Sequence, residues 1–228
     1  MVEFEDLRSR RIVYVSSCLL NQNRRYPGIA VCEGAVWELL EPLMKNGVGI
    51  EQLPCLECLG WGGVARSSVF RFLPTFYRYS GSRSFPLIGR FGRLWLWKYA
   101  RLCRKRARDV VRDIRNYRDH GYKILSIIGM NDSPTCGVTR TIDMLELARR
   151  LRELGFTHDD LAAPHIDKMR KAMPSVLMDG QGCFMKELSR KLDQEGIIIP
   201  ILGFDPWADI CGEADRVVRA VLEKTESA

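Results

Sequence analysis

The sequence predicts an α/β protein with a parallel, Rossmann-like sheet flanked by helices and carrying an arginine-rich insertion. Short apolar runs rich in β-branched residues alternate with amphipathic helical patterns, as in βαβ units. Three of these runs lead into polar loops that contain a cysteine. The length of 228 residues and the 46% hydrophobic content provide enough apolar material for one core. We therefore expect a single α/β domain over residues 1–228.

The first part of the chain predicts a strand, a helix and a second strand. Arg11–Ser16 (RIVYVS) is β-branched and aromatic, as strands prefer. Residues 33–45 carry apolar side chains at helical spacing, and Asn46-Gly47 is a typical helix end. Gly49–Leu53 predicts the second strand. A strand–helix–strand order indicates a parallel unit with a right-handed crossover.

Residues 60–120 predict a basic insertion. Residues 60–92 mix glycine, proline, serine, arginine and aromatic residues without a sustained period, which predicts an irregular segment. A segment of this length in a compact domain usually serves as a lid, a binding loop or a partner surface. Residues 94–120 predict a long basic helix that ends at Gly121.

The second half of the chain continues the alternation of strands and helices. Residues 122–128 predict the third strand, and residues 196–202 the fourth. A short strand is expected around residues 175–178. Helices are expected over residues 142–154, around 159–173, over Cys183–Gln194 and over 205–223.

The net charge of +7 comes from one segment. Residues 66–118 hold fifteen Lys or Arg against two Asp, so the rest of the chain is net acidic. Such a segment can bind nucleic acid, an anionic surface or an acidic ligand, and a solvated arginine-rich helix is the plain alternative. No apolar run is long enough to span a bilayer, and the N-terminal residues lack the apolar stretch of a signal peptide. We expect a cytoplasmic protein.

Three cysteines follow three predicted strands. Cys18 follows the first strand, Cys55 the second and Cys136 the third. Ligands of parallel α/β sheets bind beyond the carboxyl ends of the strands, so these thiols are expected to meet in one crevice. Three thiolates on separate loops can hold a metal or an iron–sulfur cluster and leave one position open. Three independently buried cysteines are the alternative.

Zinc is less favoured than a cluster, because the three histidines lie far from these motifs in the sequence. Cys55 and Cys58 form one C-x2-C pair without a second pair, so Cys58 either packs or replaces Cys55 as a ligand. The same pair would also suit a thiol redox protein. The remaining cysteines are expected to be small core residues: Cys32, Cys103, Cys183 and Cys211.

Three sequence blocks resemble the signature blocks of the DUF523 family, which includes the thiouracil desulfurases. They are SSCLLNQNRRYPG, LPCLECLGWGGVAR and NDSPTCGVTRT, and together they cover roughly residues 12–141. The family pattern is S-x-C-L-x(4–5)-R-Y-x-G, then C-P-E followed by glycines, then S-P-S-C-G. The resemblance implies a [4Fe–4S] cluster on three cysteines, whose fourth iron takes sulfur from a small thiolated substrate.

By this resemblance, Cys18, Cys55 and Cys136 are the cluster ligands. Glu57 matches the glutamate of the second block and is the implied acid/base group, and Ser133 matches the serine of the third block. Capping and turn formation are the structural alternatives for Glu57 and Ser133.

Two arginines of the first block are candidate substrate-binding residues. Arg24 and Arg25 either bind an anionic substrate, balance the cluster charge or form salt bridges. The chain departs from the family pattern in the second block, where Leu56 replaces the proline, the glycines are spread over Gly60, Gly62 and Gly63, and Cys58 is extra. Two further hypotheses therefore stay open: a nucleic-acid-binding protein with a structural metal, and a C-x2-C thiol redox protein.

Overall fold

The computed structural model describes residues 6–161 and 166–226. Its central element is a four-stranded sheet in the order β2-β1-β3-β6, with every neighbouring pair parallel. The strands are β1 (Arg11–Ser16), β2 (Gly49–Leu53), β3 (Lys123–Met130) and β6 (Ile201–Phe204). This arrangement confirms the predicted parallel α/β class.

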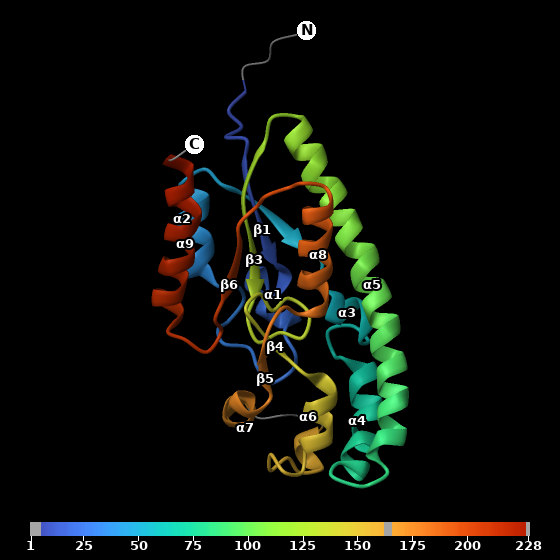
Figure 1. Cartoon of the computed structure of the whole chain (residues 1–228). Coiled ribbons are helices and arrows are strands. Elements are labelled where there is room, and N and C mark those ends of the chain that lie inside the picture. The colour runs from blue at the N-terminus through green and yellow to red at the C-terminus, as the bar shows by residue number, and fades with distance from the viewer. Residues whose placement is uncertain (1–5, 162–165, 227–228) are drawn as a thin grey trace.

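Helices cover both faces of the sheet. Figure 1 shows α2 (Trp37–Lys45) and α9 (Ile210–Glu226) on one face, and α5 (Phe85–Asp119) and α8 (Cys183–Gln194) on the other. The core between these layers contains fully buried strand residues such as Val13, Val15 and Ile127. Central strands with continuous apolar runs are the expected signature of a sheet buried on both faces.

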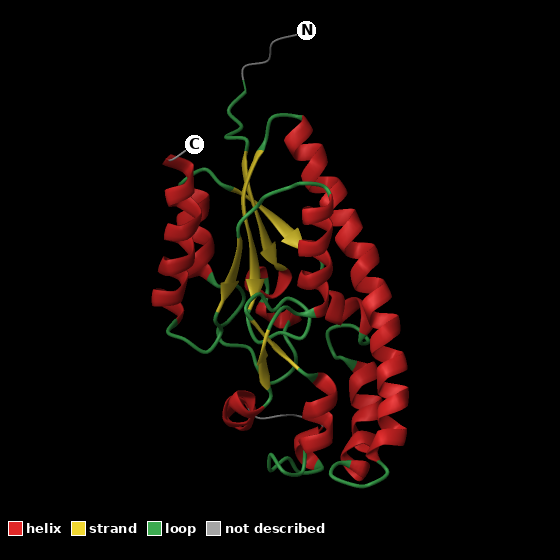
Figure 2. Cartoon of the chain, in the orientation of Figure 1, coloured by secondary structure: helices red, strands yellow, loops and turns green. Residues whose placement is uncertain are grey.

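A second group of elements lies beyond the carboxyl ends of the strands. In Figure 2 a short antiparallel pair lies below the main sheet, formed by β4 (Arg140–Ile142) and β5 (Leu177–Asp179). Further short elements complete this region: α1 (Ser17–Leu20), η1 (Gln22–Arg24), α3 (Leu56–Gly60), α4 (Ser67–Tyr79), α6 (Met144–Arg150), η2 (Asp159–Leu161), α7 (Ile166–Ala172) and η3 (Met173–Ser175).

Residues 60–92 are mostly helical, so the expectation of an irregular segment is wrong. The segment contains α4 and the first turns of α5. Val69, Leu73 and Phe76 follow at helical spacing, but a proline inside α4 and the glycines around it hide that period. Pro86 stands at the start of α5, where a helix tolerates proline because that N–H has no partner within the helix.

Other predicted boundaries shift. The fourth strand begins at Ile201 and not at residue 196, because the ladder to β3 pairs only residues 201–204. Residues 140–142 form β4, so the helix expected from residue 142 begins at Met144 after the Asp143 cap.

The helix expected around residues 159–173 is divided into η2, α7 and η3, and residues 162–165 lie outside the described residues. The last helix begins at Ile210, five residues after the predicted start at residue 205. Cys183–Gln194 is helical as predicted.

No helix in the described ranges combines the length and the apolar character that a bilayer crossing requires. The longest helix among them, α5, has 35 residues but carries many arginines.

Candidate functional site

The three strand-end cysteines follow three neighbouring strands. Cys55 follows β2, Cys18 follows β1, and Cys136 lies in the loop after β3. Because β1 pairs with β2 on one side and with β3 on the other, the chain reverses its direction of sheet growth between β1 and β3. Such a switch point opens a crevice at the carboxyl edge of a parallel sheet.

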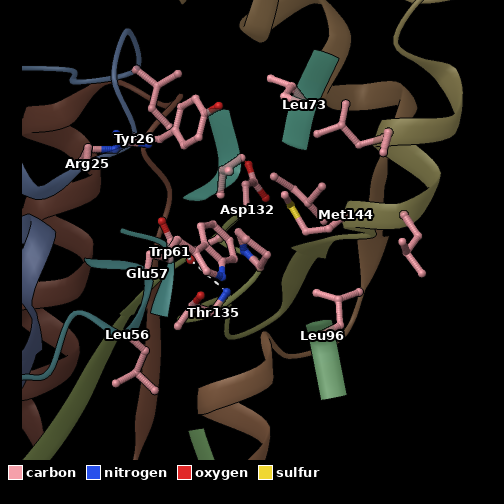
Figure 3. Close-up of a pocket in the computed structure, with 18 of the residues that line it drawn as sticks. Arg25, Tyr26, Leu56, Glu57, Trp61, Leu73, Leu96, Asp132, Thr135 and Met144 are labelled. Carbon is pink, nitrogen blue, oxygen red and sulfur yellow. Dashed lines mark hydrogen bonds between the residues drawn. The ribbon is translucent and has the colours of Figure 1, made fainter. Parts of the chain in front are cut away.

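One cavity at this edge collects all the residues predicted for the site. Its volume is about 430 Å³. It is lined by the three cysteines and by the four other candidates: Cys18, Cys55, Cys136, Glu57, Ser133, Arg24 and Arg25. Figure 3 shows Glu57 and Trp61 on one side of the cavity and Leu73 and Met144 on the other.

Cys18 sits on the single turn α1 directly after β1. The Gln22 side chain donates to the Cys18 carbonyl oxygen at 2.7 Å and accepts from the Val31 N–H, which holds this turn against the following loop. Burial raises the pKa of the Cys18 thiol to about 11, and the charge of Arg25 opposes that rise.

Cys55 occupies the position before the first residue of α3, so its side chain lies at the start of a short helix. Burial raises its pKa to about 12. A thiol protonated at neutral pH is the opposite of the lowered pKa that redox-active C-x2-C pairs have.

The Cys136 loop is held by the first turn of α8. The N–H of Cys183 donates to the Pro134 carbonyl oxygen at 2.9 Å, and the N–H groups of Phe184 and Met185 both donate to that of Thr135 at 3.1 Å. The free N–H groups of this helix start are therefore used by the loop. They hold Cys136 at the cavity wall.

Close backbone contact with this loop requires glycine at position 182. A Cβ atom there would lie 2.5 Å from the Thr135 carbonyl carbon and 2.9 Å from the Gly137 nitrogen. Both are backbone atoms, which cannot swing away as a flexible side chain does. Burial raises the pKa of the Cys136 thiol well above its usual value, with smaller contributions from Cys18, Glu57 and Cys55. These contributions show that the thiols and the carboxylate share one neighbourhood.

Ser133 links the Cys136 loop to Glu57. Its Oγ accepts from the N–H groups of Thr135 at 3.1 Å and Cys136 at 3.0 Å, and it donates to Glu57 Oε1 at 3.1 Å. The serine is thus a turn residue and at the same time a partner of the candidate acid/base group. The two interpretations that the sequence left open are both compatible with this geometry.

Arg66 is a buried residue of this site that the sequence analysis missed. Its Nη2 donates to the Arg24 carbonyl oxygen at 2.6 Å and lies 3.4 Å from Glu57 Oε2, while its Nη1 lies 2.9 Å from Cys58 Sγ. The net pKa of the Arg66 guanidinium is raised. Burial by itself would lower this pKa, but Glu57 and the thiols of Cys55 and Cys58 raise it by more. The signal in the sequence was its position at the end of the second block, LPCLECLGWGGVAR.

Cys58 is held by Arg66 and does not line the cavity, whereas Cys55 does. This placement favours packing for Cys58. Of the cysteines expected in the core, Cys103 is buried and Cys32 and Cys183 are half-buried. Cys211 is exposed, so that expectation is wrong, because the α9 face that it lies on points to solvent.

Arg25 is a buried cation that forms no ion pair within the described part of the chain. Its side chain is 9% exposed, and its Nη1 has no hydrogen-bond partner among the described residues. Burial lowers the pKa of this guanidinium. Arg24 instead donates to Ser17 Oγ at 2.9 Å. A buried cation of this kind, facing a cavity, is suited to an anion that the chain itself does not provide.

Among the residues that the structure describes, no three His, Cys, Asp or Glu side chains lie close enough to hold a single metal ion. A cluster has a different requirement, because each thiolate binds a separate iron and the ligands stand apart around a larger body. The donor set of one buried and two half-buried thiols, each after a different strand, suits a group of that kind.

The fold and the site define a class of protein: a parallel α/β protein with a cysteine-lined cavity at its sheet switch point. In comparisons with known proteins, no family model matches the chain and no solved structure matches it. The chain is similar to the uncharacterized protein MJ0003 of Methanocaldococcus jannaschii, with 29% identity over 164 residues. The aligned part is 71% of this chain and 91% of the archaeal protein.

Proposed function

We propose that the protein is a desulfurase that removes sulfur from a small thiolated compound with the help of a [4Fe–4S] cluster. The observation that carries this proposal is the convergence of Cys18, Cys55 and Cys136 with Glu57 on one cavity. The DUF523-like sequence blocks point to the same set of residues. We further propose that it acts in the cytoplasm, where thiols stay reduced.

The residues present suit such a cluster. Three cysteines would hold it and leave one iron without a protein ligand. When bound, that iron supplies a Lewis acid with an affinity for sulfur. The cluster with its thiolates is negatively charged, and the guanidinium of Arg25 provides the opposite charge beside Cys18.

The chain's own residues would handle the protons of the reaction. In the overall change, a thiocarbonyl compound and one water molecule give the corresponding carbonyl compound and hydrogen sulfide. A C–O double bond replaces the C–S double bond, both protons of the water end on the sulfur, and nothing is oxidised or reduced. Glu57 accepts a proton from the attacking water and returns it to the leaving sulfur. Ser133 Oγ donates to Glu57 Oε1, and Arg66 faces Glu57 Oε2, so the carboxylate is held from both sides.

Anaerobic purification followed by iron and sulfide counts tests the proposal. We expect about four irons per chain. Cys136→Ala should abolish iron binding, whereas the matched variant Cys58→Ala should keep it. A folded protein without iron would refute the cluster, and loss of iron only in Cys58→Ala would reassign the ligands.

A second candidate function is nucleic-acid binding by the outer face of α5. Arg101, Lys105 and Arg108 follow at helical spacing, and none has an acidic partner among the described residues. Such a row suits a phosphate backbone. RNA affinity that falls steeply with salt, without hydrosulfide release from any thiolated compound, would favour this candidate.

A further inference from the structure

The cavity extends well beyond the cysteines, and its distant walls are apolar. Much of the wall comes from three helices, α4, α5 and α6. The apolar residues that they contribute include Val69, Leu73 and Phe76 of α4, Trp95 of α5 and Leu147 of α6. In Figure 1, α4, α6 and the N-terminal part of α5 lie together beyond the carboxyl ends of the strands.

This end of the cavity offers few free polar groups among the described residues. Asp160 lines it, but Lys168 donates to Asp160 Oδ2 at 2.6 Å and Thr157 donates to the same oxygen. Lys98 and Ser68 also line the cavity, so a polar ligand body would lose its water here and gain only a few hydrogen bonds.

The mouth of the cavity is apolar as well. Phe72, Phe91 and Leu94 line the cavity while being 50%, 73% and 53% exposed. Exposed large apolar residues that gather at a cavity are typical of a ligand entrance.

The size of the cavity sets the size of the occupant. At about 430 Å³ it lies within the range of about 300–1,000 Å³ that drug-sized ligands occupy, and the proposed cluster would take up the part of this volume next to the cysteines. A lone pyrimidine ring would leave much of this apolar space empty, and burial of apolar surface is the main source of affinity in such a space.

We propose that the substrate is an apolar thiocarbonyl compound, which rests on the desulfurase function proposed above. Its C=S group faces Cys18, Cys55 and Cys136, and its apolar body extends between α4, α5 and α6. The substrate class is therefore set by these three helices and differs from an unsubstituted thiouracil.

A homologous ligand series tests this inference without depending on turnover. The dissociation constants of 6-alkyluracils, with alkyl chains from methyl to heptyl, are measured by calorimetry on the full anaerobic protein. We expect affinity to rise about fourfold for each added methylene until the cavity is filled. In the matching 6-alkyl-2-thiouracils, kcat/KM for hydrosulfide release should rise in parallel.

Two variants test whether the alkyl chain binds in this cavity. Ala148→Phe on α6 fills the cavity and should remove the gain from longer chains while leaving the methyl compound unchanged. Ala220→Phe on α9 adds the same side chain away from the cavity and should leave the whole series unchanged. The series on the unmodified protein decides the question even if Ala148→Phe does not fold.

The outcomes separate this inference from the desulfurase proposal. A flat affinity series on iron-loaded protein overturns the apolar substrate and leaves the desulfurase intact. A rising series on protein that binds no iron supports the apolar site and refutes the cluster. A gain that Ala220→Phe removes as strongly as Ala148→Phe also overturns the placement in this cavity.

Discussion

At the residue scale, the site depends on how Glu57 is held. Its two oxygens have different partners: the hydroxyl of Ser133 on one and the guanidinium of Arg66 on the other. A carboxylate fixed on both sides is pre-organised for one direction of proton transfer. The orientation comes from residues on two separate loops, after β2 and after β3.

Glu57→Gln should keep the cluster and lose turnover, because the amide preserves the shape but cannot accept a proton. We expect kcat for hydrosulfide release to fall about 10²–10⁴-fold with the iron count unchanged. Glu38→Gln, on the exposed start of α2, is the control. Unchanged turnover in Glu57→Gln would remove this residue from the mechanism.

Arg66→Met should destabilise the fold, because it removes the partner of a largely buried carboxylate and several hydrogen bonds at once. Breaking a buried ion pair costs about 3–5 kcal/mol, measured as the free energy of unfolding in urea. Arg93→Met on the exposed face of α5 serves for comparison. A loss no larger than that of Arg93→Met would show that Arg66 contributes little.

At the element scale, the Cys136 loop is the most constrained part of the site. The loop is hydrogen-bonded to the first turn of α8 and to Tyr99 of α5. Two helices on the same face of the sheet therefore hold Cys136 at the carboxyl edge of the sheet. The backbone at Gly182 has φ −63° and ψ 158°, which any residue can adopt. Only the close approach of the Thr135 carbonyl and the Gly137 nitrogen excludes a side chain there.

Gly182→Ala should therefore displace Cys136 and reduce the iron count while the protein stays folded. Gly89→Ala is the matched control, because a Cβ at this position near the start of α5 meets only Phe85 at 3.9 Å. That control should raise the free energy of unfolding by about 0.5–1 kcal/mol and leave the iron count unchanged. Full iron content in Gly182→Ala would contradict the role of this contact.

At the scale of the whole molecule, the main core touches the cavity only through a few residues, which include Leu56, Trp61, Met130 and Cys136. Val13, Val15 and Ile127 pack between the two helical layers and do not line the cavity. The architecture is thus expected to persist when the cluster is absent.

Removal of the cluster by air or a chelator should lower Tm without changing the far-UV circular dichroism. The loss of Tm follows from mass action, because a group that binds only the folded state stabilises that state. Cys136→Ala, prepared without iron, should show the lower Tm from the start. Loss of helical signal on iron removal would show that the cluster is needed for folding.

The sequence predicted the bounds of an element correctly where an uninterrupted strand or helix pattern lies between clear turn signals, as in β1, β2 and α8. It failed in residues 60–92, because proline and glycine disguised the apolar period of α4, whose apolar side faces a cavity rather than the core. The shift of β6 had another cause: which residues of an apolar run join a ladder depends on its neighbour, here β3.

For the site, the strand-end positions of Cys18, Cys55 and Cys136 were enough to predict one shared crevice. Arg66 could not be assigned from sequence, because its role depends on a fully buried side chain that reaches three segments at once. The seven predicted residues do meet at one cavity. Their chemical roles remain predictions for the iron counts and variants described above.

The helices α4 and α6 contact each other and α5. The segments that form α4 and α6 are not part of the main sheet. The cysteines and Glu57, in contrast, lie in loops and short helices that directly follow strands of the main sheet. Under the proposed function, reactivity and recognition reside in different portions of the polypeptide. Replacement of residues 67–79 and 144–150 by other helices of equal length would then redirect the protein toward new compounds while its chemistry is inherited unchanged.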